Sequence, residues 1–210
     1  YKNCYVDLKE TCLRSETTVK VFDQMRKLQG FTDEGSPGRD WNVATGMVIE
    51  GKAGFQIMGD WAKGEFTAAG KVPGVDYYCA ATPSNNGYLY NVDSFIFYKT
   101  SDPDKQEGQK LLAKLMMGKN FQKVFNLYKG SIPARLDVPM DEFDKCAKTS
   151  NSDIKTAGAS GGLVPSFAHG MAQGNTMKAA LQDVITEHFN SDMSSVDAAN
   201  ALADSVLDNM

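Results

Sequence analysis

The stretch Ala53-Gly-Phe-Gln-Ile-Met-Gly-Asp-Trp61 joins a short apolar run to the start of a helix. Its apolar part, residues 53–58, is bounded by glycines and is too brief for a helix, which predicts a buried strand. Asp60 and Trp61 then open a short helix that we expect to reach about residue 69. A strand that leads directly into a helix is typical of α/β proteins, and this is the fold class that the sequence predicts.

Helices and strands alternate on both sides of this stretch. Capping residues and apolar spacing predict helices at 15–29, 42–51, 103–117, 119–129, 140–149, 175–190 and 195–208, strands at 75–81 and 93–98, and a loop at 83–87. So few strands cannot make a self-standing doubly wound sheet in a chain of this length. The simplest account places further strands upstream of the given sequence.

Apolar residues at helical spacing predict which helix faces are buried. The expected faces are Leu111, Leu112, Leu115 and Met116 in one helix, Phe121, Val124, Phe125 and Tyr128 in the next, and Leu181, Val184 and Ile185 near the end of the chain. His188 continues the last of these stripes, and we assign it to packing.

Composition excludes several classes of partner. The 210 residues are 42% hydrophobic and carry a net charge of −4, enough for one large or two small globular domains. A mildly acidic, evenly mixed chain lacks the basic clusters that bind nucleic acid. Because no apolar run approaches the roughly 20 residues that cross a bilayer, no transmembrane helix is expected. The sequence starts at Tyr1 without a signal peptide, as a mature secreted protein or a fragment would.

The four cysteines indicate the redox environment only weakly. Their spacing and the presence of just two histidines disfavour a zinc site. We expect at least one disulfide, with Cys79–Cys146 as the favoured pair, and buried free thiols are the alternative. Disulfides would indicate an oxidising compartment.

Motifs of common enzymes are absent from the sequence. It has no nucleophile elbow, phosphate-binding loop, zinc-protease motif or dinucleotide fingerprint. Asp60, Glu65 and Asp93 could include the acid and base of a glycoside hydrolase, but solvated or capping roles are the simpler interpretation. No cofactor or metal is expected.

Several aromatic and polar residues lie where binding sites collect, at loops and at the ends of strands and helices. The indole of Trp61 could cover the apolar face of a sugar, or it could belong to the core. Asn91 and Asp93 precede a strand and could bind hydroxyl groups or cap the loop. Lys129 suits the carboxyl end of its helix, and His169 lies in a glycine-rich loop, where it could simply be exposed or satisfied locally.

Taken together and in order, these residues resemble the type-1 extracellular solute-binding proteins of ABC sugar importers, and most closely their proteobacterial glucose/mannose-binding branch. The segments that carry the resemblance are Arg39-Asp-Trp-Asn-Val-Ala-Thr-Gly-Met47, Phe55-Gln-Ile-Met-Gly-Asp-Trp-Ala-Lys-Gly-Glu-Phe66, Tyr90-Asn-Val-Asp-Ser-Phe95, Phe125-Asn-Leu-Tyr-Lys-Gly-Ser-Ile-Pro-Ala-Arg135 and Phe167-Ala-His-Gly-Met171.

The resemblance implies a periplasmic-binding-protein-like (type II) fold of two lobes that close on a sugar. Such proteins are about twice as long as this chain, which would hold their carboxy-terminal half. Residues 1–90 and 134–210 would form part of one lobe, and residues 91–133 would return to the other.

The resemblance also implies a function and a set of site residues. Trp61 would stack on a monosaccharide, glucose being favoured, while Asp93, Lys129, His169 and more weakly Asn91 would bind its hydroxyl groups. The protein would be a periplasmic monomer when full length, with an ABC permease as its partner and no catalytic activity. A carbohydrate hydrolase that uses Asp60 and Asp93 is the alternative.

Overall fold

The computed structural model describes residues 1–83 and 87–210, so residues 84–86 of the loop expected at 83–87 lie outside the described part. The chain divides into two compact units. Unit 1 comprises Tyr1–Gly38, Leu89–Asn91 and Leu163–Met210, and unit 2 comprises Arg39–Tyr88 and Val92–Gly162. Among the described residues, no helix combines the length and the apolar character needed to cross a bilayer.

Unit 1 is built mainly from helices. They are the single-turn π-helix η1 (Lys2–Val6), α1 (Glu10–Leu13), α2 (Glu16–Gln29), α8 (Asn175–Asn190) and α9 (Ser195–Asp208). Ser15 caps α2 by accepting a hydrogen bond from the backbone N–H of Thr18 at 3.3 Å, which satisfies a donor that the first helical turn leaves unpaired. The predicted bounds of α2, α8 and α9 are confirmed.

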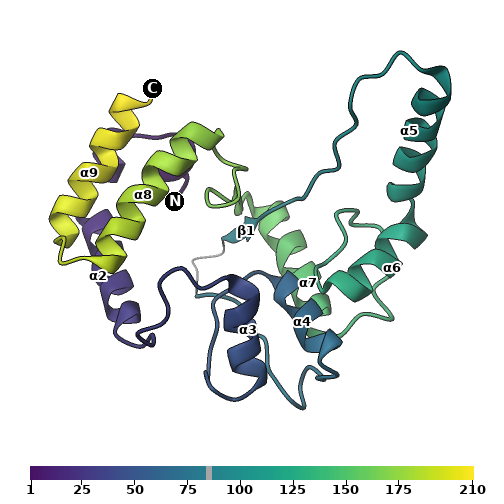
Figure 1. Cartoon of the computed structure of the whole chain (residues 1–210), viewed down its shortest axis with the longest axis horizontal. Coiled ribbons are helices and arrows are strands. Elements are labelled where there is room, and N and C mark those ends of the chain that lie inside the picture. The colour runs from purple at the N-terminus through teal and green to yellow at the C-terminus, as the bar shows by residue number, and fades with distance from the viewer. Residues whose placement is uncertain (84–86) are drawn as a thin grey trace. The chain divides into compact units, whose positions relative to one another are not determined.

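The core of unit 1 forms where α2, α8 and α9 pack together (Figure 1). Alanines at three positions of α9 let the neighbouring helices approach closely, while Leu202 and Val206 fill the space between them. Leu181 of α8 and Phe22 of α2 complete this core. His188 is fully buried beside Phe22, with 4.7 Å between ring centroids, so its assignment to packing is confirmed.

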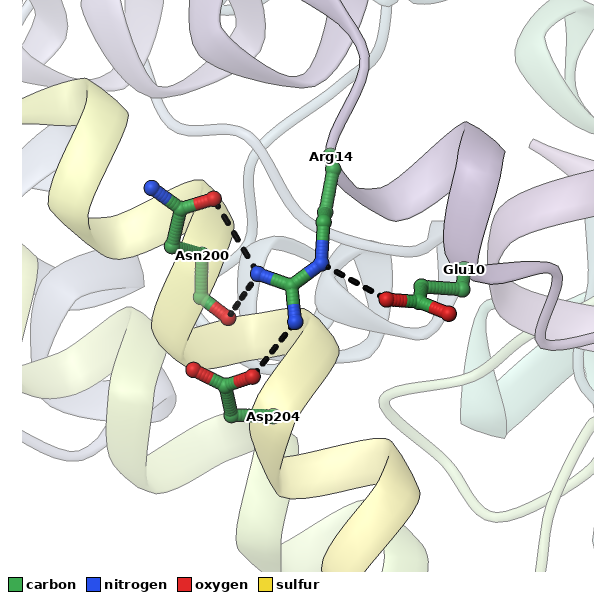
Figure 2. Close-up of polar contacts among 4 residues, drawn as sticks. All are labelled: Glu10, Arg14, Asn200 and Asp204. Carbon is green, nitrogen blue, oxygen red and sulfur yellow. Dashed lines mark hydrogen bonds and ion pairs between the residues drawn. The ribbon is translucent and has the colours of Figure 1, made fainter.

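A guanidinium group ties the amino-terminal part of unit 1 to its last helix (Figure 2). Arg14 donates to Glu10 at 2.9 Å and to Asp204 at 2.5 Å, and its third nitrogen donates to the side-chain oxygen of Asn200 at 3.1 Å. The planar fork of arginine suits such multiple contacts. The Cys4–Cys12 disulfide closes the loop from η1 to α1 in the same unit.

A short β pairing belongs largely to unit 1. Strand β1 (Tyr88–Tyr90) pairs with β2 (Leu163–Pro165), and the N–H of Ser166 donates to the carbonyl of Tyr90 at 2.8 Å. Neither strand was predicted, because each has only three residues and its pairing joins positions more than 70 residues apart in the sequence.

Unit 2 is also rich in helices. They are α3 (Trp41–Ile49), the 3₁₀ turn η2 (Asp60–Ala62), α4 (Lys63–Ala68), α5 (Pro103–Met116), α6 (Lys119–Lys129) and α7 (Lys145–Ser160). Asp102 caps α5 by accepting from the N–H groups of Asp104 and Lys105, as the Asp-Pro start predicts. The helix expected at 140–149 instead begins at Lys145, where Asp144 is the cap, and continues to Ser160.

The core of unit 2 is small. Val138, Phe143 and Ala147 form its buried cluster. The structure joins Cys79 to Cys146, the pair favoured from the sequence, with 5.8 Å between their Cα atoms. This disulfide links the segment that contains Cys79 to the first turn of α7.

Three strands expected in unit 2 are wrong. Residues 53–58 and 93–98 form no strand, and the segment 75–81 contributes only an isolated bridge between Pro73 and Tyr77. The side chains expected to be buried are open to solvent, with Phe55 95% exposed. A strand needs a neighbouring strand for its backbone hydrogen bonds, and these segments have none among the described residues.

The buried face expected on α5 is also wrong for most of its members. Met116 is buried, but Leu115 is 59% exposed, and Leu111 and Leu112 are exposed as well. In the next helix, Val124, Phe125 and Tyr128 are exposed while Phe121 is partly covered. Helical spacing correctly identified an apolar face on each helix, but the described residues leave most of each face exposed.

Candidate functional site

Trp61 lies in η2 and its indole folds back over the residue that precedes the turn. A Cβ atom built on Gly59 would lie 2.1–2.5 Å from three carbon atoms of the Trp61 six-membered ring. The ring therefore occupies the space that a side chain at position 59 would need. Trp61 is partly exposed, so the residue is not enclosed in the core.

Asp60 connects η2 to the segment that follows α6. Its carboxylate accepts a hydrogen bond from the backbone N–H of Ile132 at 3.0 Å. Burial raises the pKa of Asp60, while the hydrogen bond from Ile132 and the charges of Lys63 and Lys129 act in the opposite direction. Because the effect of burial is the largest, Asp60 holds its proton to a higher pH than an exposed aspartate does.

Lys129 is the last residue of α6, and its ammonium group forms an ion pair with Asp93. The same ammonium lies 5.7 Å from the centroid of the Phe125 ring, within the range of a cation–π interaction. The helix ends at Gly130, which adopts φ 90°, a left-handed conformation that glycine accepts readily.

A close backbone approach joins α4 to the end of α6. A Cβ atom on Gly64 would lie 2.7 Å from the carbonyl oxygen of Lys129, and one on Gly130 would lie 2.5 Å from the backbone nitrogen of Gly64. No side chain fits at either position without displacing backbone. The structure thus brings α4, which directly follows the turn that holds Trp61, into contact with the end of α6, which holds Lys129.

A buried lysine stabilises the same region. Lys63, at the start of α4, is almost inaccessible and donates to the carboxylate of Asp144 at 2.7 Å. Burial opposes ionisation of Asp144, but Lys63 and the N–H of Ala147 outweigh it and lower the pKa of this carboxyl group. Sequence reasoning missed this pair; a signal was available only for Asp144, since an aspartate before a helix is a typical cap.

Two predicted site residues belong to unit 1. Asn91 follows β1, and His169 lies after β2, where its Nδ1 atom is 2.7 Å from the hydroxyl of buried Ser166. This contact restrains the imidazole in its loop. Trp61, Asp93 and Lys129 are therefore collected in unit 2, and Asn91 and His169 lie in unit 1.

Other features of the described residues do not indicate a second site. No group of three or more histidine, cysteine, aspartate or glutamate residues within 1–83 and 87–210 could hold a metal ion. A groove of about 570 Å³ between α5 and α6 is lined mainly by Leu111, Leu115, Phe121 and Val124. It has few groups that could bind sugar hydroxyls.

The sequence resembles known proteins over nearly its whole length. Residues 4–151 match the family described as bacterial extracellular solute-binding protein. The chain belongs to this family. Membership favours a binding protein over the glycoside hydrolase considered as the alternative, and this solute-binding protein is not expected to carry out catalysis.

Relatives of this solute-binding protein include two named probable sugar-binding periplasmic proteins. The one from Brucella suis is 46% identical over 207 residues, which are 98% of this chain and 49% of the relative. The one from Rhizobium meliloti is 43% identical over 207 residues, 98% of this chain and 50% of the relative. The chain spans about half the length of these curated relatives.

A more distant relative comes from Pyrococcus horikoshii. An uncharacterized ABC transporter extracellular-binding protein of Pyrococcus horikoshii is 31% identical over 179 residues, which are 85% of this chain and 39% of the relative. The similarity to this relative is lower and covers less of both chains than the similarity to the two sugar-binding relatives.

Proposed function

We propose that this protein captures a monosaccharide in the periplasm and delivers it to the permease of an ABC transporter. Two observations carry the proposal: Trp61 is partly exposed, and the Lys129–Asp93 ion pair lies at the end of α6, whose backbone meets α4 just after the turn that holds Trp61. An aromatic face and charged hydrogen-bonding groups are what a sugar requires. The names of the relatives from Brucella suis and Rhizobium meliloti support a sugar as the solute.

Glucose is the sugar that we propose. Trp61 would cover the apolar face of the ring, while Lys129 and Asp93 would exchange part of their mutual interaction for the hydroxyl groups. His169 and, more weakly, Asn91 are further candidates for binding hydroxyl groups. Support for this choice comes from the Lys-Gly-Ser-Ile-Pro segment at 129–133 and the Ala-His-Gly-Met segment at 168–171, which resemble the glucose/mannose-binding branch.

We also propose that this chain works within a longer, monomeric polypeptide. Residues 1–90 and 134–210 would contribute to one lobe and residues 91–133 to the other, with the sugar bound where the lobes close. Two observations support this arrangement: the relatives are about twice as long, and the apolar side chains of 53–58 and 93–98 are exposed. Strands supplied by the rest of the polypeptide would cover them and satisfy their backbone groups.

Titration with glucose, followed by tryptophan fluorescence, tests the proposal. We would compare the 210-residue chain with a version extended at its amino end to the length of the relatives. Saturable binding in both would place a sufficient site within these residues, and binding only in the longer version would show that the added part completes it. Absence of binding in both would contradict glucose as the ligand.

Substitution of Trp61 tests its role in the same titration. In the extended version, Trp61→Ala removes the stacking surface, and we expect affinity to fall by roughly tenfold or more. Isothermal calorimetry is the appropriate measurement, because the variant loses its fluorescent reporter. Trp41→Phe is the matched control and should leave affinity unchanged. An unaltered affinity in Trp61→Ala would remove Trp61 from the site.

A further inference from the structure

We propose that Gly59 positions Trp61. Because glycine has no side chain, the indole can lie against the backbone of residue 59 in its sugar-binding orientation. The proposal rests on the proposed function for the role of Trp61 in binding. It adds a residue that would not touch the sugar itself and would control how the stacking surface is presented.

The ring, and not the backbone, requires glycine at this position. Gly59 has φ −70° and ψ 165°, an extended conformation that any residue can adopt. A Cβ atom there would nevertheless lie 2.1, 2.3 and 2.5 Å from the Cζ3, Cη2 and Cε3 atoms of Trp61. These separations are far below the carbon–carbon contact distance of roughly 3.5–4.0 Å. Any residue with a side chain at position 59 must therefore displace the indole or the backbone.

The backbone around Trp61 has little freedom to move. Asp60 is held by its hydrogen bond with the N–H of Ile132 at 3.0 Å. Gly64 is packed against the carbonyl of Lys129 and against Gly130, with no room for a Cβ atom on either glycine. Because η2 and α4 are fixed on both sides of Trp61, an added methyl group at position 59 is relieved most easily by rotation of the indole.

Rotation of the indole would change the proposed binding surface. Side chains occupy separate staggered rotamers, so the ring would move to a different orientation and not shift slightly within the same one. The contact between α4 and α6 that restrains Trp61 also restrains Lys129. An indole in another rotamer would thus present a different surface to the sugar, even though the Lys129–Asp93 pair would still be present.

A double-mutant cycle in the extended polypeptide tests this inference. The variants are Gly59→Ala, Trp61→Ala and both together, compared with the unsubstituted protein. Glucose affinity is measured by calorimetry. Near-ultraviolet circular dichroism of the 210-residue chain, in a Trp41→Phe background, reports the environment of Trp61 without any sugar. Gly54→Ala is the matched control, because a Cβ atom on Gly54 would meet nothing within 4 Å.

We expect Gly59→Ala to change the dichroism of Trp61 and to weaken glucose binding by roughly tenfold, while Gly54→Ala changes neither. In the Trp61→Ala background, Gly59→Ala should have no further effect on affinity, since the clashing ring is gone. An unchanged Trp61 spectrum, or an equal loss of affinity in both backgrounds, would overturn the inference.

One further outcome separates the inference from the proposed function, and the folding of the variants gives a second test of the clash with the ring. If Gly59→Ala alters the spectrum but neither Gly59→Ala nor Trp61→Ala alters affinity, Gly59 positions the ring and the sugar-binding role of Trp61 is wrong. If Gly59→Ala does not fold, recovery of folding in the double variant supports the clash with the ring. Failure of the double variant to fold, with Trp61→Ala folded, contradicts it.

Discussion

Unit 1 and unit 2 contain similar apolar residues in very different surroundings. In unit 1, Leu181 and Leu202 are inaccessible to solvent between α8, α9 and α2. In unit 2, Phe55 and Ile96 are 95% and 77% exposed in segments that form no strand. Helices satisfy their own backbone groups and need only a neighbouring apolar face. Strands need a partner of the correct register, and residues 53–58 and 93–98 have none among the described residues.

Removal of the two disulfides gives the largest expected effects on the stability of the units. In the chain-entropy account, a cross-link stabilises by restricting the unfolded chain, and its effect grows with the length of the loop it closes. Cys79 and Cys146 are separated by 67 residues, whereas Cys4 and Cys12 are separated by 8. Replacing Cys79 and Cys146 with serine should lower the free energy of unfolding by about 4 kcal/mol. Replacing Cys4 and Cys12 with serine should lower it by about 2.5 kcal/mol.

Urea denaturation of the two double-serine variants and of the unsubstituted chain measures both effects. Following helix content by circular dichroism, together with hydrogen exchange of each unit, identifies where stability is lost. Each disulfide lies within one unit, so each loss should appear first in its own unit. An equal or greater loss from the Cys4–Cys12 pair would show that restriction of the unfolded chain is not the dominant effect.

Truncation of one buried leucine gives the next largest expected effect, and an exposed leucine in the other unit provides the comparison. Leu202 is fully buried in the core of unit 1, and Leu202→Ala should destabilise unit 1 by about 3 kcal/mol through lost burial and the resulting cavity. Leu115 of α5 is 59% exposed, and Leu115→Ala should change stability by less than about 0.5 kcal/mol. Chemical denaturation of the 210-residue chain checks both values.

The same leucine pair also tests whether the exposed face of α5 is covered in the longer polypeptide. In a version extended to the length of the relatives, Leu115→Ala should become more destabilising, because added chain would bury this side chain. The effect of Leu202→Ala should change little. An equally small effect of Leu115→Ala in both versions would show that α5 keeps its apolar face in solvent.

The helices were predictable from the sequence because their signals are local. Ser15 and Gly30 mark the ends of α2, and Asp102 with Pro103 marks the start of α5. Alternation of helices with apolar runs also predicted α/β character, and membership of the solute-binding family fits a periplasmic-binding-protein fold. The strands were not predictable, because the run at 93–98 has a strand-like composition but no partner among the described residues.

The candidate site was only partly predictable for a related reason. Trp61, Asp93 and Lys129 could be selected as residue types that suit a sugar, at positions in loops and at the ends of expected elements. The contact of Gly64 with the end of α6 joins positions about 65 residues apart, and nothing in the local sequence indicates it. Likewise, the placement of the indole over Gly59 depends on a side-chain rotamer, which sequence does not reveal.

Protonation of His188 gives the smallest expected effect on stability. This dependence on pH should be limited to unit 1. Its ring is fully buried, and neither nitrogen has a hydrogen-bond partner among the described residues. Burial lowers the pKa of His188, and Arg26 of α2 adds to this effect while Asp23 opposes it. Above the unfolded pKa of about 6.5 the ring is neutral in both states. As the pH falls below that value, the unfolded chain binds the proton first, so unit 1 loses stability.

His188→Phe removes the titrating group while keeping a ring against Phe22. Between pH 7 and pH 5, the unsubstituted chain should lose more stability than the variant, and the difference should level off once the pH falls below the folded-state pKa. Urea denaturation at several pH values, followed through hydrogen exchange of α8, provides the comparison. Parallel stability curves would mean that His188 is protonated equally in both states, and a steeper curve for the variant would reverse the sign of the coupling. Because the effect arises from one buried ring in α8, it should leave the stability of unit 2 unchanged, which again separates the two units.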